Sequence, residues 1–271
     1  MQLGISSYTF TWAVGVPGSM PAKPLSATEL IDKADSAKVG IVQIADNLPL
    51  EKLTMENLKD LKQYASGKNI SLEMGGRGIM PEHFMECLKT AAIIDSPILR
   101  MVIDGTGFES DIQTVISIVR EMVPELKSRN IKLAIENHDR FKAREFEKIV
   151  LETDSDVVGI CLDSVNSLGA GEGFETVSEI LAPYTINLHV KDFTIHRVSH
   201  KMGFVIEGRP AGKGMLDIPG LVSRINSYGR CNSAILELWT PPAETIESTI
   251  KKEEIWAEES ITYLKKLKWT N

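Results

Sequence analysis

Eight short apolar runs alternate with amphipathic segments along this chain of 271 residues. Each run is five or six residues long and rich in Ile, Leu and Val, which is typical of strands buried on both faces. The runs lie at residues 3–8, 40–45, 70–74, 98–103, 132–136, 158–163, 186–191 and 234–239.

Between these runs, apolar residues recur at the i, i+3, i+4 spacing of helices. The predicted helices cover residues 26–38, 54–66, 81–94, 110–128, 143–152, 173–182, 217–227 and 250–267. Ser26 and Glu29 form a capping-box pattern, and Asp217 precedes a proline in the first turn of its helix.

Strand–helix alternation repeated eight times predicts a parallel sheet closed as a (β/α)8 TIM barrel. An open doubly wound sheet is the competing fold, but it favours a glycine-rich turn after the first strand, where this chain has TFTWAVGV. No Pro-, Gly- or Ser-rich linker divides the chain. We therefore expect one domain over residues 1–271.

The charge and cysteine content narrow the functional classes. The net charge is -7, the pI is about 5.4, and there is no basic run, so nucleic-acid binding is not expected. Cys87, Cys161 and Cys231 are odd in number and far apart, which favours a reducing compartment. The sequence shows neither a signal peptide nor an apolar span, so we expect a cytoplasmic protein without a membrane partner.

Four predicted strands in succession carry, at or near the carboxyl end, a side chain that can bind a metal: Glu136, Asp163, His189 and Glu237. Active sites of such barrels lie at the carboxyl ends of the strands. One such residue alone is more commonly solvated, salt-bridged or part of the core, but four at matching positions favour a metal site. Three carboxylates and an imidazole suit one divalent cation of the Mn²⁺, Mg²⁺ or Co²⁺ type, with Zn²⁺ also compatible.

Other residues near the strand ends are candidates for binding substrate. Lys191 follows His189 and would contact a substrate oxygen or pair with Asp163, while His138 would bind substrate or orient Glu136.

Two further candidates come from earlier strands. Trp12 would face a sugar ring, with loop packing as the equal alternative. Glu73 lies in the third strand, and Arg100, in the middle of the fourth, needs an internal partner that Glu73 could supply.

The stretches IENH, CLDSVNS, NLHVKDF and LELW, in that order, resemble the xylose isomerase-like barrels. The resemblance is greatest to the sugar phosphate isomerase/epimerase group, which includes ketose 3-epimerases and inosose dehydratases. It implies that Glu136, Asp163, His189 and Glu237 bind the metal and that the two glutamates form the acid–base pair. One glutamate would remove a proton beside a carbonyl, the other would return it on the opposite face, and the metal would stabilise the enediolate. The implied function is a carbohydrate isomerase or epimerase.

The chain departs from the epimerase pattern at two positions. Asn166 stands where these enzymes place a histidine, and Ile195 stands where they place an arginine. Asn166 is therefore a candidate for substrate binding, as are Arg197 and Arg209, either of which could replace the missing arginine. Both departures bear on the choice of substrate and leave the metal ligands intact.

Residues 193–214 are longer than the other loops that follow strands, and their pattern around residues 201–203 predicts a hairpin. The family often carries a similar segment over its site, so we expect a lid.

Three alternatives remain open. A dehydratase would use the same site to lose a hydroxyl β to the carbonyl. An endonuclease IV-type barrel needs a histidine-rich three-zinc cluster, which five histidines and an acidic charge disfavour. A non-catalytic binding barrel would not need both Glu136 and Glu237. The exposed helical face of such a barrel is compatible with a homodimer or homotetramer.

Overall fold

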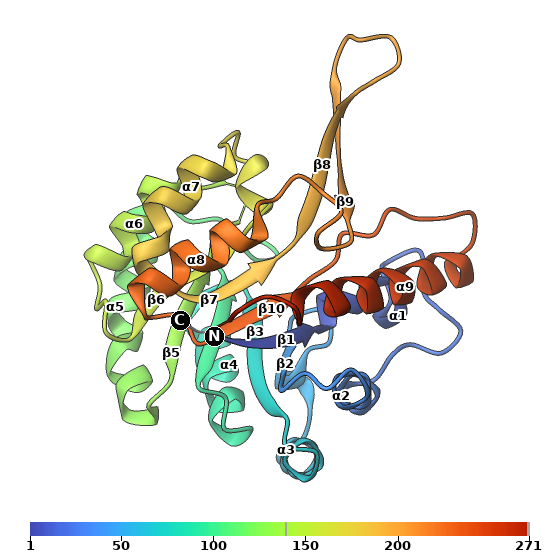
Figure 1. The fold of residues 1–271 in the computed structure, drawn as a ribbon. Helices are drawn as coiled ribbons and strands as arrows, with labels where there is room; N and C mark the ends of the chain where they lie inside the picture. The colour runs from blue at the N-terminus through green and yellow to red at the C-terminus, as the bar shows by residue number, and fades with distance from the viewer. Residues whose placement is uncertain (139, 270–271) are drawn as a thin grey trace.

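A closed barrel of eight parallel strands forms the centre of the protein, with helices around its outside (Figure 1). The structure is a computed structural model, and it describes residues 1–138 and 140–269. The order of strands around the barrel is β1-β10-β7-β6-β5-β4-β3-β2. The predicted (β/α)8 barrel is confirmed. The predicted domain also includes residues 139, 270 and 271, which lie outside the described residues.

The strands of the barrel match the eight apolar runs. They are β1 (Gln2–Ser6), β2 (Ile41–Ile44), β3 (Ser71–Arg77), β4 (Ile98–Val102), β5 (Lys132–Glu136), β6 (Val158–Asp163), β7 (Thr185–Val190) and β10 (Ser233–Leu236). The last strand is shorter than predicted, so that Glu237 lies just beyond it, where its backbone N–H donates to the Val190 carbonyl.

The helices follow the predicted segments, apart from the short α1, which the sequence pattern missed. They are α1 (Thr11–Val14), α2 (Ala27–Ser36), α3 (Met55–Gly67), α4 (Pro81–Ile93), α5 (Ile112–Arg129), α6 (Ala143–Leu151), α7 (Phe174–Leu181), α8 (Ile218–Tyr228) and α9 (Ile246–Leu264). Short 3-10 helices cover Ser7–Phe10, Leu50–Lys52, Asn166–Leu168 and Ala182–Tyr184. Ser26 and Asp217 cap α2 and α8 as predicted.

The strands have an apolar outer face and an unusually polar inner face. Outward residues such as Leu133 and Leu188 belong to the main hydrophobic core with the helices. Inside the barrel, fully or almost fully buried polar side chains lie at Gln43, Glu73 and Arg100. Since a buried polar or charged group is costly without a partner, this interior must be a hydrogen-bonded network.

Residues 192–209 form the predicted hairpin, which projects beyond the barrel (Figure 1). Its strands are β8 (Asp192–Arg197) and β9 (Phe204–Arg209), paired antiparallel. The buried carboxylate of Asp192 accepts the backbone N–H groups of Gly212, Gly214 and Leu216 and so ties down the return of the chain. A Cβ at Gly214 would overlap that carboxylate, which explains the glycine there.

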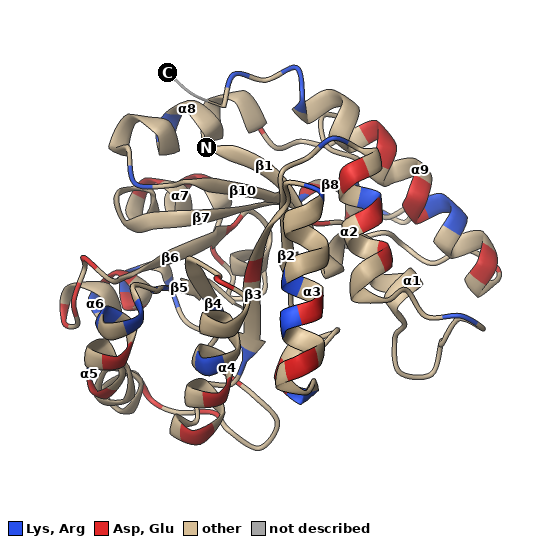
Figure 2. Ribbon diagram, turned by 90° about the horizontal axis from the view of Figure 1, so that it is seen from below, with Lys and Arg blue, Asp and Glu red and all other residues tan. Residues whose placement is uncertain are grey.

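Acidic and basic residues are interspersed along outer helices such as α3 and α9 (Figure 2). The first residue lies beside the end of the last described segment, because the N-terminal ammonium of Met1 donates to the Trp269 carbonyl at 2.7 Å. Within residues 1–138 and 140–269, no helix has both the length and the apolarity needed to cross a membrane.

Candidate metal centre

The four side chains predicted as metal ligands converge at the carboxyl ends of the strands, and each is almost completely buried. His189 Nδ1 lies 3.5 Å from Glu136 Oε2, 3.8 Å from Asp163 Oδ2 and 3.5 Å from Glu237 Oε2. Asp163, His189 and Glu237 each offer one ligand atom, and those atoms lie within 4.8 Å of one another. One cation could contact all of them.

Four atoms face one another here: Glu136 Oε2, Asp163 Oδ2, His189 Nδ1 and Glu237 Oε2. Among the described residues, the three carboxylate oxygens contact only cationic side chains, Arg100 and Lys191, besides His189. Three buried carboxylates that face two cationic side chains leave an excess of negative charge, which a bound cation would offset. Three oxygens and one nitrogen are suitable ligands for Mn²⁺, Mg²⁺, Co²⁺ or Zn²⁺. These residues therefore fit a divalent cation.

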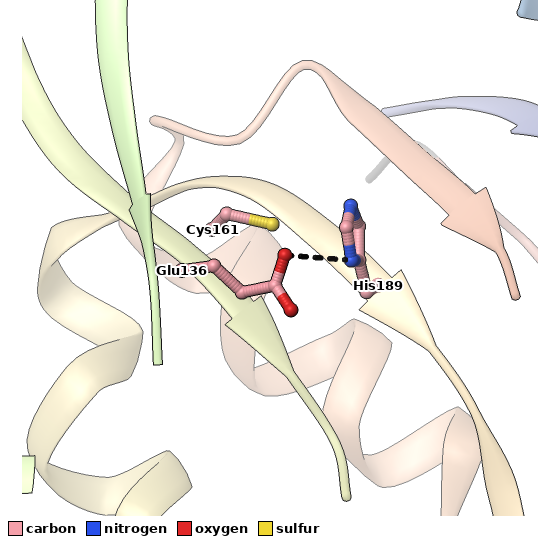
Figure 3. Close-up of side chains that lie close together, drawn as sticks. All are labelled: Glu136, Cys161 and His189. Carbon is pink, nitrogen blue, oxygen red and sulfur yellow. Dashed lines mark ion pairs between the residues drawn. The ribbon is translucent and has the colours of Figure 1, made fainter. Parts of the chain in front are cut away.

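Glu136 and His189 point toward each other from β5 and β7, with Cys161 beside them on β6 (Figure 3). Cys161 could join a second ligand set with these two residues. However, its Sγ donates to Asn187 Oδ1 at 3.1 Å, and burial keeps the pKa of its thiol well above the usual value. The protonated thiol is a poorer ligand than the carboxylates.

Arg100, on β4, is the partner of Glu136, and not of Glu73 as its position suggested. Arg100 Nε lies 2.6 Å from Glu136 Oε2, and both side chains are 2% exposed. Its Nη1 also lies 3.3 Å from Asp46 Oδ1. The other oxygen of Glu136 accepts from Asn166 Nδ2 at 2.6 Å. Glu136 is thus surrounded by donors and a fixed cation.

Lys191 extends between two of the carboxylates. Its Nζ lies 2.8 Å from Asp163 Oδ2 and 2.9 Å from Glu237 Oε2. Burial would lower the pKa of Lys191, but Asp163 and Glu237 raise it well above its usual value. The lysine is therefore an ammonium ion.

The pKa values of Asp163 and Glu237 are both shifted by the charges of Lys191 and His189. Burial opposes ionisation, yet Lys191 and His189 hold the pKa of Asp163 below its usual value. For Glu237, His189 and Lys191 likewise outweigh burial and lower the pKa. Burial would lower the pKa of His189, but Glu237 and Glu136 raise it. Both carboxylates are anionic and available to a cation.

Other residues of this network were missed from the sequence. Ser6 Oγ donates to Glu237 Oε1 at 3.0 Å, and His189 Nε2 lies 2.7 Å from Gln43 Oε1. Tyr8 donates to Asp46 Oδ2 at 3.1 Å. The position of Ser6 and Gln43 at or near the ends of β1 and β2 was the available signal.

A cavity of about 630 Å³ adjoins the centre. Asn166 and Lys191 line it, and Lys191 is the one basic side chain among the described residues that do so. The remaining wall is largely apolar, with Trp12, Trp239, Val165, Leu168, Leu238, Ile206, Pro241 and Pro242. The cavity thus has a charged side near the ligands and an apolar side away from them.

The other candidates for substrate binding lie in different places. Trp12 lines the cavity, where its Nε1 donates to the Thr240 carbonyl at 2.8 Å. Glu73 lies inside the barrel, where it accepts from Gln43 and Asn187. His138 Nε2 lies 3.5 Å from Arg77 Nη2.

The two arginines lie on the hairpin and are not among the residues that line the cavity in the described structure. Arg197 donates to the Lys201 carbonyl at 3.0 Å. Arg209 Nη2 lies 2.7 Å from Glu207 Oε1. Ile195, where the epimerases place an arginine, also lies on the hairpin.

Together, the closed barrel and this ligand set define a TIM barrel with a candidate divalent-metal centre. The chain belongs to the xylose isomerase-like TIM barrel family, whose family model matches residues 76–267. One relative, the 3-oxo-isoapionate decarboxylase of Pectobacterium atrosepticum, is 31% identical over 264 residues, which cover 97% of this chain and 95% of the relative.

Solved structures share the fold at lower sequence identity. D-psicose 3-epimerase from Clostridium cellulolyticum, with D-tagatose, is 17% identical with a TM-score of 0.73, covering 98% of this chain and 97% of that one. A xylose isomerase-like TIM barrel protein from Mycobacterium smegmatis, in complex with magnesium, is 12% identical with a TM-score of 0.70 and covers 97% of both chains. These relatives include both an epimerase and a decarboxylase, so family membership leaves the reaction open.

Proposed function

We propose that the protein is a metal-dependent decarboxylase of a 3-oxo sugar acid. The observation that carries this proposal is the pairing of both candidate bases with fixed cations, at the charged side of a largely apolar cavity. Arg100 lies 2.6 Å from Glu136, and Lys191 lies 2.9 Å from Glu237. The decarboxylase that is 31% identical over nearly the whole chain supports the same class of reaction.

The pairing disfavours a reaction that begins with removal of a proton. A carboxylate held by a cation binds a proton less readily than a free one, so it is a weaker general base. Decarboxylation of a 3-oxo acid needs no base to begin. It needs a site that stabilises negative charge on the carbonyl oxygen while the carboxylate loses it.

The charges of the centre suit an acidic substrate. Glu136, Asp163 and Glu237 face Arg100 and Lys191, which leaves a formal charge of -1 with His189 neutral. A bound divalent cation would reverse this to +1 and would act as a Lewis acid toward the carbonyl oxygen. Apolar walls formed by Leu168 and Trp239 would weaken the solvation of the substrate carboxylate.

In the proposed decarboxylation, Lys191 donates the proton and Asn166 holds Glu136. The bond between the carboxyl carbon and its neighbour breaks, CO₂ leaves, and the electron pair enters an enolate. The Lys191 ammonium gives a proton to the enolate carbon, forming the ketone, and water restores the ammonium. Asn166 holds Glu136 in place beside the reacting group.

The test combines the Mn²⁺-loaded protein with 3-oxo-isoapionate, other 3-oxo sugar acids, and the ketoses D-psicose and D-tagatose in deuterated water. We expect one CO₂ and one solvent deuterium per product molecule from a 3-oxo acid. We expect Lys191→Met to reduce turnover at least about 100-fold, which is typical of a lost proton donor. Lys62→Met, which removes an exposed lysine paired with Asp95 on the outside of the barrel, is the matched control.

A second candidate is the isomerase or epimerase implied by the sequence. It is favoured by the presence of both glutamates at one candidate cation site, each 3.5 Å from His189 Nδ1. This reaction would give ketose epimers and exchange of the proton beside the carbonyl without CO₂, and Glu237→Gln would abolish that exchange. Loss of water from the product would instead indicate the dehydratase. Either result would refute the decarboxylase.

A further inference from the structure

We propose that Gln43 and Glu73 are positioning residues that fix the His189 ring with Nδ1 facing the cation. The inference rests on the proposed metal centre but not on which reaction occurs there. Gln43 lies on β2, Glu73 on β3 and His189 on β7, and all three side chains are buried inside the barrel.

The orientation of the Gln43 amide follows from its neighbours. Its Nε2 lies 3.0 Å from Glu73 Oε2 and 3.2 Å from Asn187 Oδ1, and both of these atoms are acceptors. The amino group must therefore face Glu73 and Asn187. Its carbonyl oxygen, Oε1, is left facing His189 Nε2 at 2.7 Å.

This orientation selects one form of the imidazole. An amide oxygen only accepts hydrogen bonds, so His189 Nε2 must carry the hydrogen and the neutral ring keeps a lone pair on Nδ1. Nδ1 is the ring atom directed toward Glu136, Asp163 and Glu237. A reversed amide would favour the opposite tautomer, which places a hydrogen where the cation binds.

Further contacts hold Asn187, which in turn helps to hold Gln43. Asn187 Nδ2 donates to Glu73 Oε2 at 3.2 Å and to Ser233 Oγ at 2.7 Å. Its Oδ1 accepts from Cys161 Sγ at 3.1 Å. The amide groups of Asn187 and Gln43 are thus both fixed by the Glu73 carboxylate, on the side of His189 away from the ligand atoms.

Burial of the Glu73 carboxylate at this position lowers the stability of the fold. Glu73 is 2% exposed, burial raises its pKa, and no lysine or arginine among the described residues pairs with it. A buried carboxylate without a cation destabilises a fold, so simple packing does not explain it. Control of the histidine does explain it, because outer hydrogen bonds of this kind typically change metal affinity 10–100-fold.

The first measurement uses the unmodified protein without metal. Nitrogen-15 NMR of labelled histidine reports the tautomer of His189 at a pH high enough for the ring to be neutral, and His189→Asn assigns the signal. We expect hydrogen on Nε2 alone. Hydrogen on Nδ1 of the neutral His189 ring would overturn the inference, independently of any measurement of Mn²⁺ affinity.

The second measurement is the affinity for Mn²⁺ alone, by electron paramagnetic resonance. Gln43→Leu should bind Mn²⁺ about 10–100-fold more weakly and show both tautomers. The double change Gln43→Glu with Glu73→Gln exchanges the donor and the acceptor of the hydrogen bond between positions 43 and 73. A carboxylate at position 43 still offers His189 Nε2 an acceptor. The double variant should therefore bind Mn²⁺ within about threefold of the wild-type affinity.

Ser96→Ala is the control for losing any buried polar group, since the Ser96 hydroxyl accepts from Met74 N and donates to the Ile98 carbonyl, and neither partner is a candidate ligand. We expect it to leave Mn²⁺ affinity unchanged. A folded Gln43→Leu protein with wild-type affinity and a single tautomer would refute the positioning role. Neither readout involves substrate, so failure of the proposed decarboxylation would leave this test intact.

Discussion

Arg100 and Glu136 form an ion pair in the interior of the barrel, with Nε 2.6 Å from Oε2. The pair joins β4 to β5, and its carboxylate oxygen is the one that faces His189 Nδ1 at the candidate cation site. Removing one partner of a buried pair leaves an uncompensated charge and typically costs about 3–5 kcal/mol. The arginine therefore matters for stability whenever the cation is absent.

We predict that Arg100→Met lowers the free energy of unfolding by about 3–5 kcal/mol in metal-free protein, measured by urea denaturation. Mn²⁺ should recover part of that loss, because it places positive charge beside Glu136. Arg144→Met is the matched control, since its guanidinium is exposed and pairs with Glu147, and should cost less than about 1 kcal/mol. Equal effects of the two substitutions would contradict this account of Glu136.

The Lys191 ammonium and the cation compete for the same oxygens. We predict that Lys191→Met binds Mn²⁺ more tightly, by roughly 3–10-fold for a change of about 1 kcal/mol, because Asp163 and Glu237 lose a competing positive charge. Turnover should fall in the same variant. Calorimetric titration with Mn²⁺ measures the affinity, and weaker binding would show that Lys191 helps to assemble the site.

The fold and the convergence of the four candidate ligands were predictable because both depend on local pattern. Four of the apolar runs carry a candidate ligand at or within two residues of their end, as in Ile135–Glu136 and Leu162–Asp163, and parallel strands bring their carboxyl ends to one edge of the barrel. The position of Lys191 beside Asp163 was one of the two roles predicted for it. Strand alternation was enough to place these side chains inward.

The partners across the barrel were not predictable in this way. Gln43 contacts His189, which lies 146 residues further along the chain, and Arg100 pairs with Glu136 and not with Glu73. These contacts depend on the stagger of strands and on the reach of each side chain, which periodicity does not encode. The short α1 was missed because one helical turn has no detectable period.

Metal removal should destabilise the protein. We predict that Mn²⁺ at 100 times its dissociation constant raises the free energy of unfolding by about 2.7 kcal/mol, detected as a higher Tm that a chelator reverses. Asp163→Asn should abolish this response while the fold persists, because Oδ1 can still accept from the backbone N–H groups of Val165 and Asn166.

Asp217→Asn makes the same chemical change at an exposed helix cap, where asparagine caps equally well, and should keep the full response to Mn²⁺. A normal Tm shift in Asp163→Asn would remove Asp163 from the ligand set.

Glu253 on α9 predicts a pH dependence of stability. Burial raises its pKa to about 7, even though the backbone N–H groups of Trp12 and Ala13 donate to it. The folded protein therefore holds this proton more tightly than the unfolded chain. The resulting stability is complete below the unfolded pKa of 4.5 and is lost as pH rises toward 7, by at most on the order of 3 kcal/mol.

Glu253→Gln removes this titration, so the difference in unfolding free energy between pH 5 and pH 8 should be smaller than in the wild type. Glu254→Gln, at the exposed neighbour that pairs with Lys33, should keep the wild-type dependence. Urea denaturation across this pH range measures both. Identical profiles for wild type and Glu253→Gln would assign the pH dependence to other groups.

The hairpin contributes one side chain to the cavity, and we propose that it acts there as a lid. Ile206 on β9 lines the cavity, whereas Val205 is equally exposed, at 38%, but is not among the described lining residues. We predict that Ile206→Ser raises KM about fivefold, equivalent to about 1 kcal/mol of lost apolar contact. Mn²⁺ affinity should not change.

Val205→Ser is the matched control for Ile206→Ser, because alternate residues of a strand face opposite sides. Steady-state kinetics on a 3-oxo acid would measure KM for both variants. An equal rise in KM for Ile206→Ser and Val205→Ser would indicate that the substitutions loosen the hairpin, and would contradict contact between Ile206 and substrate.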